Sequence, residues 1–108
     1  MKKGAVYLGD CRCGTIVQDE GSFRFWYTEE WLAKEDARPV SLTLPLQKEA
    51  HESNTLFPFF DGLIPEGYLL QVAIRAFGLN GNDRMGLLLK TCHDCIGNVS
   101  VYEEADHA

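Results

Sequence analysis

The sequence predicts an α+β domain in which an antiparallel β-meander packs against a few helices from the C-terminal half of the chain. Three β-rich runs separated by short turns occupy the first third, and the second half carries apolar residues at helical spacing. The 108 residues are 45% hydrophobic and 24% charged, a composition typical of one globular domain. We therefore expect a single domain over residues 1–108, with a polar tail from about residue 103.

The predicted meander contains three strands. "GAVYLG" and "CGTIVQ" flank a turn at Gly9–Asp10, and "SFRFWY" follows a second turn at residues 19–21. In the third run aromatic residues alternate with Arg24 and Trp26, so one face of this strand should be aromatic: Phe23, Phe25 and Tyr27.

The middle of the chain is less regular. Thr28 is a suitable N-cap for a short helix over residues 29–32, whose first turn is acidic. "PVSLTLPL" alternates Val40, Leu42 and Leu44, and its flanking prolines favour an extended segment or an edge strand. Residues 47–55 read as a polar loop.

The second half is predicted to be helical until its last strand. Pro58 and Pro65 each suit the first turn of a helix, and Gly78 suits the end of one. Asn82 is placed to cap a further helix, whose apolar residues recur at i, i+3, i+4 and i+7: Met85, Leu88, Leu89 and Cys92. "GNVSVYE" predicts a final strand with Val99 and Val101 on one face.

Tyr68 does not belong to the apolar stripe of its predicted helix. At about 100° per residue, Tyr68 and Arg75 point away from the stripe, which comprises Leu69, Leu70, Ala73, Ile74 and Phe77. An aromatic ring on the solvent side of a helix suggests a binding role. The alternative is that Tyr68 packs on the neighbouring polar loop of residues 47–55.

Charge and hydropathy exclude several classes of protein. Sixteen acidic against ten basic residues give a net charge of −6, which disfavours direct binding of nucleic acid. The apolar runs are too short to span a membrane. The first one, Ala5 to Leu8, is also too short for a secretion signal, so we expect a cytoplasmic protein with reduced thiols.

The four cysteines form the pairs Cys11/Cys13 and Cys92/Cys95, which raises the possibility of a zinc site. One intervening residue is tight for the first pair, and Cys92 completes the apolar stripe of its helix. The second pair lacks the strand-to-helix setting that activates a redox thiol. We therefore expect ordinary thiols and no metal or cofactor, with a small metal or redox module as a less favoured alternative.

No arrangement of residues resembles an active site. The sequence contains neither a G-x-S-x-G motif nor a phosphate-binding glycine loop. Asp61 and Glu66 could form an acid–base pair, but carboxylates beside helix starts usually stabilise free N–H groups. We predict a protein that is not an enzyme and has no small-molecule substrate.

Several stretches together resemble the HipA N-terminal subdomain 1 family: "AVYLGDCRCGTIVQDEGSFRFWYTEEWL", "PVSLTLPL", "FFDGLIPEGYLLQ" and "DCIGNVSV". In HipA-type serine/threonine kinases this module precedes the kinase core. The resemblance runs from about Val6 to Tyr102 and rests chiefly on the P-E-G and D-C-x-G motifs. The sequence departs from the family pattern at two places. Tyr68 stands where tryptophan is frequent, and Cys92–His93 stands where a glycine-rich stretch usually precedes the D-C pair.

The chain ends at Ala108, where the kinase core would begin, and so resembles the stand-alone HipS-type antitoxins of tripartite HipBST toxin–antitoxin systems. This resemblance implies a non-enzymatic antitoxin that neutralises a HipT-like kinase toxin, in a complex that also holds a HipB-like DNA-binding protein. A scaffold that links these two proteins without blocking the kinase is the alternative. The expected contact residues are Tyr68 as the anchor with Asp61, Pro65, Glu66, Gly67 and Arg75 around it.

Overall fold

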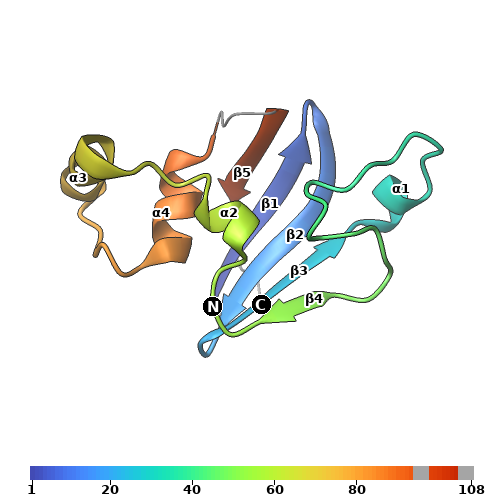
Figure 1. Ribbon diagram of the computed structural model, residues 1–108, viewed down its shortest axis with the longest axis horizontal. Helices are drawn as coiled ribbons and strands as arrows, with labels where there is room; N and C mark the ends of the chain where they lie inside the picture. The colour runs from blue at the N-terminus through green and yellow to red at the C-terminus, as the bar shows by residue number, and fades with distance from the viewer. Residues whose placement is uncertain (94–97, 105–108) are drawn as a thin grey trace.

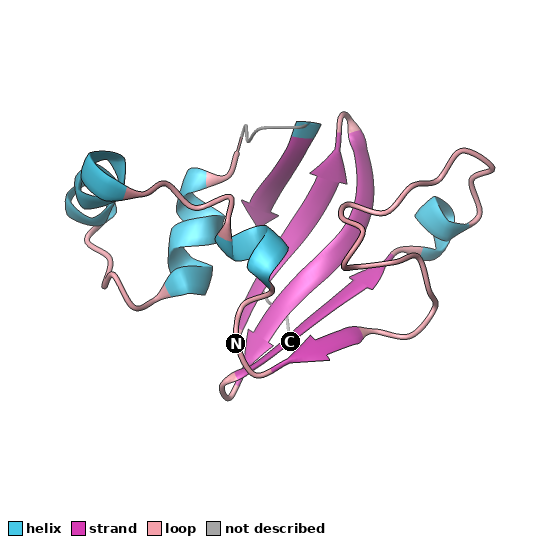
Figure 2. Cartoon of the chain, in the orientation of Figure 1, coloured by secondary structure: helices cyan, strands magenta, loops and turns pink. Residues whose placement is uncertain are grey.

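The computed structural model describes residues 1–93 and 98–104 and contains a five-stranded antiparallel sheet with four helices (Figures 1 and 2). The strand order in the sheet is β4-β3-β2-β1-β5. This arrangement confirms the predicted α+β fold. The strands are β1 (Lys2–Leu8), β2 (Cys11–Asp19), β3 (Ser22–Tyr27), β4 (His51–Ser53) and β5 (Val99–Glu103).

The predicted meander of β1, β2 and β3 is confirmed. Both of its turns use positive backbone φ angles, 62° at Gly9 in the first, and 50° at Glu20 and 82° at Gly21 in the second. The final strand, β5, pairs with the free side of β1, so that Val101 lies opposite Val6. The first and last strands of the domain are therefore neighbours.

The helices are α1 (Glu29–Leu32), α2 (Pro58–Asp61), α3 (Gly67–Phe77) and α4 (Arg84–Thr91). Thr28 caps α1 as predicted, because its Oγ1 accepts a hydrogen bond from the Trp31 N–H at 3.1 Å. Pro58 lies in the first turn of α2, also as predicted. Among the helices of residues 1–93 and 98–104, none has the length and apolar character needed to cross a membrane.

Two helix starts differ from the prediction by one or two residues. Pro65 lies outside α3, because the N-cap of that helix is Glu66. Asp83 rather than Asn82 caps α4, and its Oδ1 accepts a hydrogen bond from the Gly86 N–H at 3.0 Å. An N-cap side chain accepts a hydrogen bond from the backbone N–H two or three residues later. Asp83 lies three residues before Gly86, whereas Asn82 lies four residues before it.

The hydrophobic core lies between one face of the sheet and the helices α2 and α4 (Figure 1). The aromatic face predicted for β3 points into it, with Phe25 fully buried against Phe60 of α2. From α4, a continuous run of side chains from Met85 to Leu89 is buried. Val99 and Val101 of β5 complete the core from the edge of the sheet, as predicted.

The segment from Pro39 to Leu46 is not the extended strand that its alternation predicts. Ser41 and Leu44 form an isolated bridge across a tight turn, which leaves Leu42 94% exposed while Leu44 is buried. The Tyr27 hydroxyl donates to the Leu44 carbonyl and accepts from the Val40 N–H, so one buried hydroxyl holds both sides of the turn. Prolines and the lack of a neighbouring strand outweigh the alternation.

The predicted polar loop of residues 47–55 contains a strand instead. β4 pairs with β3 through the residue pairs Phe23–Ser53, Arg24–Glu52 and Phe25–His51. Its three residues are polar because β4 is a short strand at the edge of the sheet.

Candidate partner-binding surface

Helix α3 stands at the end of the molecule farthest from β3 and β4 (Figure 1). Among the helices it packs against α4, and Ala73 is its one buried residue. Leu70 and Ile74 are partly buried against the core. Three members of the predicted apolar stripe therefore face inward.

The other two members of that stripe were predicted wrongly. The side chains of Leu69 and Phe77 are 65% and 49% exposed. Because α3 lies at an end of the molecule, α4 covers a narrower part of its circumference than the helical pattern suggests. Val72, which the sequence analysis did not single out, is 44% exposed.

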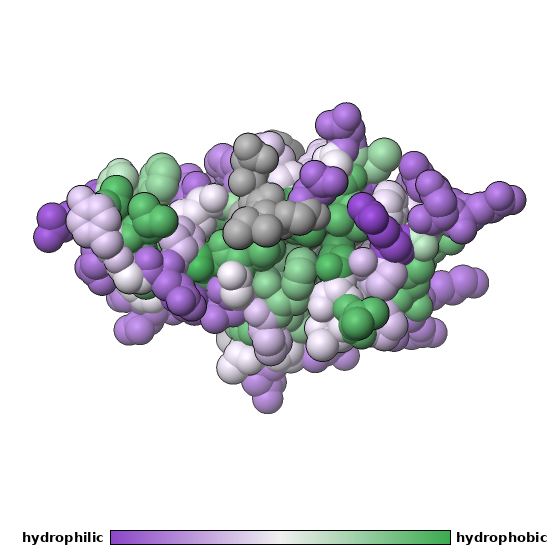
Figure 3. Space-filling view, turned by 45° about the horizontal axis from the view of Figure 1, so that its top comes forward, coloured by the Kyte–Doolittle hydropathy of each residue, from purple (hydrophilic) through white to green (hydrophobic). Residues whose placement is uncertain are grey.

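Tyr68 is 81% exposed, which confirms that it points away from the core. An exposed ring of this kind is not packed on the segment of residues 47–55, so that alternative is wrong. On a helix with about 100° per residue, Tyr68, Leu69 and Val72 lie within roughly 100° of one another. We call these three residues the α3 surface; Phe77 lies about 180° around the helix from Tyr68 and is not part of it. Figure 3 shows apolar side chains exposed at this end of the molecule.

The backbone on either side of α3 explains why the helix begins and ends where it does. Glu66 is extended, with φ −121° and ψ 166°, and Gly67 has φ 60°, a value that strongly favours glycine. A Cβ atom at Gly67 would meet no neighbouring atom, so its backbone angle, rather than crowding, requires glycine there. Gly78 ends the helix in the left-handed conformation, as predicted, and its N–H donates to the Ile74 carbonyl.

The charged candidate residues fall into two groups. Asp61 Oδ1 accepts a hydrogen bond from Arg84 Nε at 2.7 Å, so this carboxylate already joins α2 to α4. Glu66 and Arg75 are exposed at the start and in the last turn of α3. Glu66 and Arg75 are thus the charged side chains that border the α3 surface most directly.

The cysteines provide no catalytic chemistry near this surface. Burial raises the pKa of the Cys13 thiol to about 12, which keeps it protonated and unreactive, and Cys11 is an exposed free thiol. Cys92 is buried at the end of α4 and is disulfide-bonded, so the expectation of a reduced thiol is wrong for this residue, whereas Cys11 and Cys13 are free thiols as expected. Cys95 and the D-C-x-G motif lie outside the described residues. Within residues 1–93 and 98–104, no cluster of three or more potential metal ligands occurs.

An exposed apolar helix face is suited to binding another macromolecule. One signal in the sequence could have revealed it. The apolar residues of α3 cover more than one side of the helix, whereas a helix on the surface of a globular domain needs only one apolar stripe. The excess indicates a second contact that the domain itself does not supply.

Comparison with known proteins identifies the family. The model of the HipA N-terminal domain matches residues 4–102, so the chain belongs to the HipA N-terminal domain family. A solved N-terminal domain of HipA toxin has the same fold, with a TM-score of 0.74 and 27% sequence identity; the match covers 99% of this chain and 96% of that one. The resemblance inferred from the motifs is thereby confirmed.

Two curated relatives differ in length. An uncharacterized protein from Haemophilus influenzae is 29% identical over 104 residues, which cover 96% of this chain and 94% of that protein. A putative kinase, Y4mE, from Sinorhizobium fredii is 33% identical over 92 residues, which cover 84% of this chain but only 22% of the kinase. The same domain thus occurs both in a protein of similar length and as a small part of a longer one.

Proposed function

We propose that this protein is a non-enzymatic antitoxin that binds a HipT-like serine/threonine kinase toxin through the α3 surface and inhibits it. The observation that carries the proposal is the exposure of Tyr68 on a helix whose neighbouring exposed residues, Leu69 and Val72, are also apolar. Apolar patches rimmed by polar residues mark protein interfaces. The relation to HipA toxins and to a putative kinase supports a kinase as the partner.

Tyr68 has the properties of an interface anchor. Tyrosine combines a large apolar ring with a hydroxyl and is enriched among the residues that dominate binding energy. Its neighbours Pro65 and Gly67 are small or rigid. Apart from the two chain neighbours of Gly67 and the backbone of its own helix, no described residue would contact a Cβ atom built at Gly67. A partner surface therefore has room to approach the ring closely.

The charges of the molecule agree with this partner. The net charge of −6 complements the basic groups with which kinases hold nucleotide phosphates. In this proposal Glu66 and Arg75 lie at the rim, and Asp61 supports the site from below through its ion pair with Arg84. The complex would be cytoplasmic and would include a HipB-like DNA-binding protein. In this proposal the DNA-binding protein contacts the kinase and not the α3 surface.

The proposal is tested by replacing Tyr68. Tyr68→Ala should leave the free energy of unfolding within about 0.5 kcal/mol of the wild type, because the ring is exposed. It should weaken binding of the kinase by about 2 kcal/mol, roughly thirtyfold. Thermal melts measure the first quantity, and titration with a HipT-like kinase measures the second. Tyr68→Trp should bind at least as tightly.

Leu42→Ala is a matched control, since Leu42 is also an exposed apolar residue but lies in the turn of residues 41–44, far along the chain from α3. It should alter neither stability nor binding. Unchanged kinase affinity in Tyr68→Ala would refute the anchor. Tight binding without loss of kinase activity would instead support the scaffold function.

A further inference from the structure

The face of the sheet opposite α2 and α4 carries a groove. The strand register places Val17 of β2 directly between Lys3 of β1 and Arg24 of β3. Because side chains alternate along a strand, Asp19 lies on this same face two residues further along β2. Trp26 lies on it two residues from Arg24 in the other direction. The cavity has a volume of about 480 Å³.

The two basic residues form the walls of the groove with their aliphatic stems. Lys3 Nζ lies 3.8 Å from Glu104 Oε1, beyond β1, and Arg24 Nε lies 3.2 Å from Glu52 Oε1, on β4. These acids stand on opposite sides of the groove, so they draw the two positive charges outward, away from β2. The buried Val17 is left as an apolar floor between the stems.

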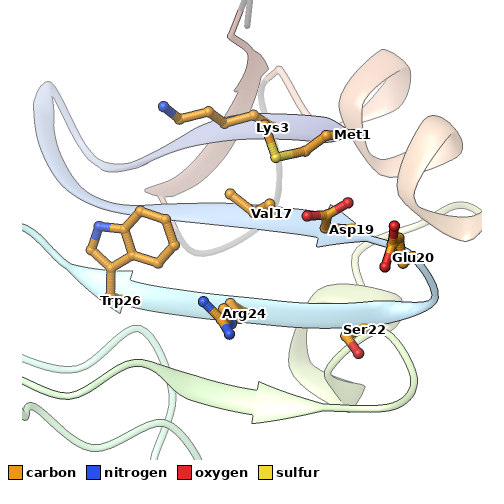
Figure 4. Close-up of a pocket in the computed structure, with 8 residues that line it drawn as sticks. All are labelled: Met1, Lys3, Val17, Asp19, Glu20, Ser22, Arg24 and Trp26. Carbon is orange, nitrogen blue, oxygen red and sulfur yellow. The ribbon is translucent and has the colours of Figure 1, made fainter. Parts of the chain in front are cut away.

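The two ends of the groove differ in chemistry. The half-buried indole ring of Trp26 lies at one end, and the carboxylates of Asp19 and Glu20 lie at the other (Figure 4). Within residues 1–93 and 98–104, neither carboxylate forms an ion pair. The groove thus has an apolar floor at Val17, walls formed by Lys3 and Arg24, and two carboxylates at one end, where Met1 and Ser22 complete the lining.

Glu20 is held at this end of the groove by the tight turn between β2 and β3. Glu20 has φ 50° and Gly21 has φ 82°, so both central residues of the β2–β3 turn are left-handed. Asparagine, aspartate or glycine is preferred at the first of these positions. Glutamate is less common there, and the two-residue hairpin accounts for its left-handed backbone.

We propose that this groove binds the side chain of an arginine presented by a basic segment of a partner protein. The arginine stem would lie on Val17 between the stems of Lys3 and Arg24, and its guanidinium would contact the carboxylates of Asp19 and Glu20. A planar guanidinium pairs with two carboxylates better than an ammonium does. The net charge of −6 attracts basic segments and repels anionic ligands.

This site is separate from the α3 surface and does not rest on the proposed kinase interaction. The groove is formed by β1, β2 and β3, whereas the α3 surface belongs to a helix that packs against α4. A negative result in the arginine-peptide assay would therefore not refute the kinase-binding proposal, and a negative result in the kinase assay would not refute the arginine site.

The test is an NMR titration of the full chain with the peptide acetyl-Gly-Arg-Gly-amide at low salt. We expect saturable shifts of the Val17 and Glu20 amides and of the Trp26 indole N–H. The same peptide with citrulline in place of arginine keeps the shape but lacks the charge. It should bind at least tenfold more weakly.

Glu20→Asn separates binding from folding, because asparagine suits the left-handed turn but lacks the negative charge. This variant should melt at a higher temperature than the wild type and bind the arginine peptide at least threefold more weakly. Adding Asp19→Asn should bring the loss to tenfold or more. Glu35→Gln removes an exposed acid outside the groove and should have no effect on binding.

The proposal is overturned if the citrulline peptide binds as well as the arginine peptide. It is equally overturned if Glu20→Asn binds with unchanged affinity, or if no saturable shift occurs at the groove.

Discussion

Helices α3 and α4 lie side by side, yet they relate to the core in opposite ways. Every residue of α4 from Met85 to Leu89 is buried, although the helix also carries Arg84 and Lys90. α3 is longer and more apolar, but Ala73 is its one buried residue. The apolar content of a helix therefore does not predict how much of it the domain covers.

The difference follows from position. α4 lies between the sheet and its helical neighbours, with contacts to β1, β5, α2 and α3, so core surrounds most of its circumference. α3 reaches the core through one side only, through Leu70, Ala73 and Ile74. Its remaining apolar residues are available to another molecule. Substitutions in α4 should therefore lower stability, and substitutions in α3 should weaken binding.

The largest effect is expected in α4. Leu88→Ala removes a fully buried side chain and should lower the free energy of unfolding by about 2–5 kcal/mol, because it leaves a cavity in the core. Leu69→Ala in α3 makes the same chemical change at an exposed position and should cost about 0.5 kcal/mol or less. Urea denaturation of both variants measures the contrast. Similar losses in the two would mean that α3 is part of the core.

A smaller effect is expected for Val72, and on binding rather than on stability. Val72→Ser makes the centre of the α3 surface polar without altering Tyr68, and should weaken kinase binding by about 1 kcal/mol, roughly fivefold. Stability should change by less than about 0.5 kcal/mol, since Val72 is exposed. Isothermal titration with the kinase measures the binding term.

Leu42→Ser is the matched control for Val72→Ser, because it makes the same kind of change at an exposed residue away from α3. Tyr68 and Val72 are one turn apart, so combining Tyr68→Ala with Val72→Ser should give non-additive losses if both contact the same partner. Additive losses would mean that Tyr68 and Val72 contribute to kinase binding independently. Equal effects of the two serine variants on kinase binding would mean that Val72 lies outside the interface.

Local signals predicted the sheet and most helices correctly. The turns after β1 and β2, the Thr28 cap and the apolar spacing of α4 each involve residues close together in the sequence. β4 was missed because its three polar residues become a strand only by pairing with Phe23 to Phe25, a contact between distant parts of the chain. The alternation of Val40, Leu42 and Leu44 misled for the opposite reason, since no strand pairs with that segment.

The candidate sites also include features that local sequence patterns predict and features that depend on contacts between distant parts of the chain. The direction of Tyr68 followed from helical periodicity alone and is confirmed by its exposure. The exposure of Leu69 and Phe77 did not follow, because periodicity gives relative directions around a helix but not how much of it a neighbour covers. The groove over Val17 depends on the register of three strands, which no local pattern specifies.

The smallest predicted effect concerns how the two helices begin. α4 starts with a side-chain cap, because Asp83 accepts from the Gly86 N–H and pairs with Lys2 Nζ at 2.8 Å, whereas Glu66 provides no such bond to α3. Burial by itself would raise the pKa of Asp83, but the hydrogen bonds from Lys2 and Gly86 and the charge of Lys2 outweigh it, so the pKa lies below its ordinary 3.8. The stabilisation is therefore complete above pH 3.8 and is lost as the pH falls through the lower, folded-state value.

Asp83→Asn tests this pH dependence, because asparagine still caps a helix but carries no charge. At pH 7 it should lower the free energy of unfolding by about 0.5 kcal/mol, since the pair with Lys2 is partly exposed and therefore screened by solvent. The gap between the variant and the wild type should close as the pH falls below 3.8, where the wild-type carboxylate becomes protonated. Urea denaturation between pH 7 and pH 2.5 measures it, and Glu66→Gln, which removes the matching charge at the start of α3, should change stability little at pH 7. A gap for Asp83→Asn that stays constant over this range would show that its carboxylate does not stabilise the start of α4 through its charge.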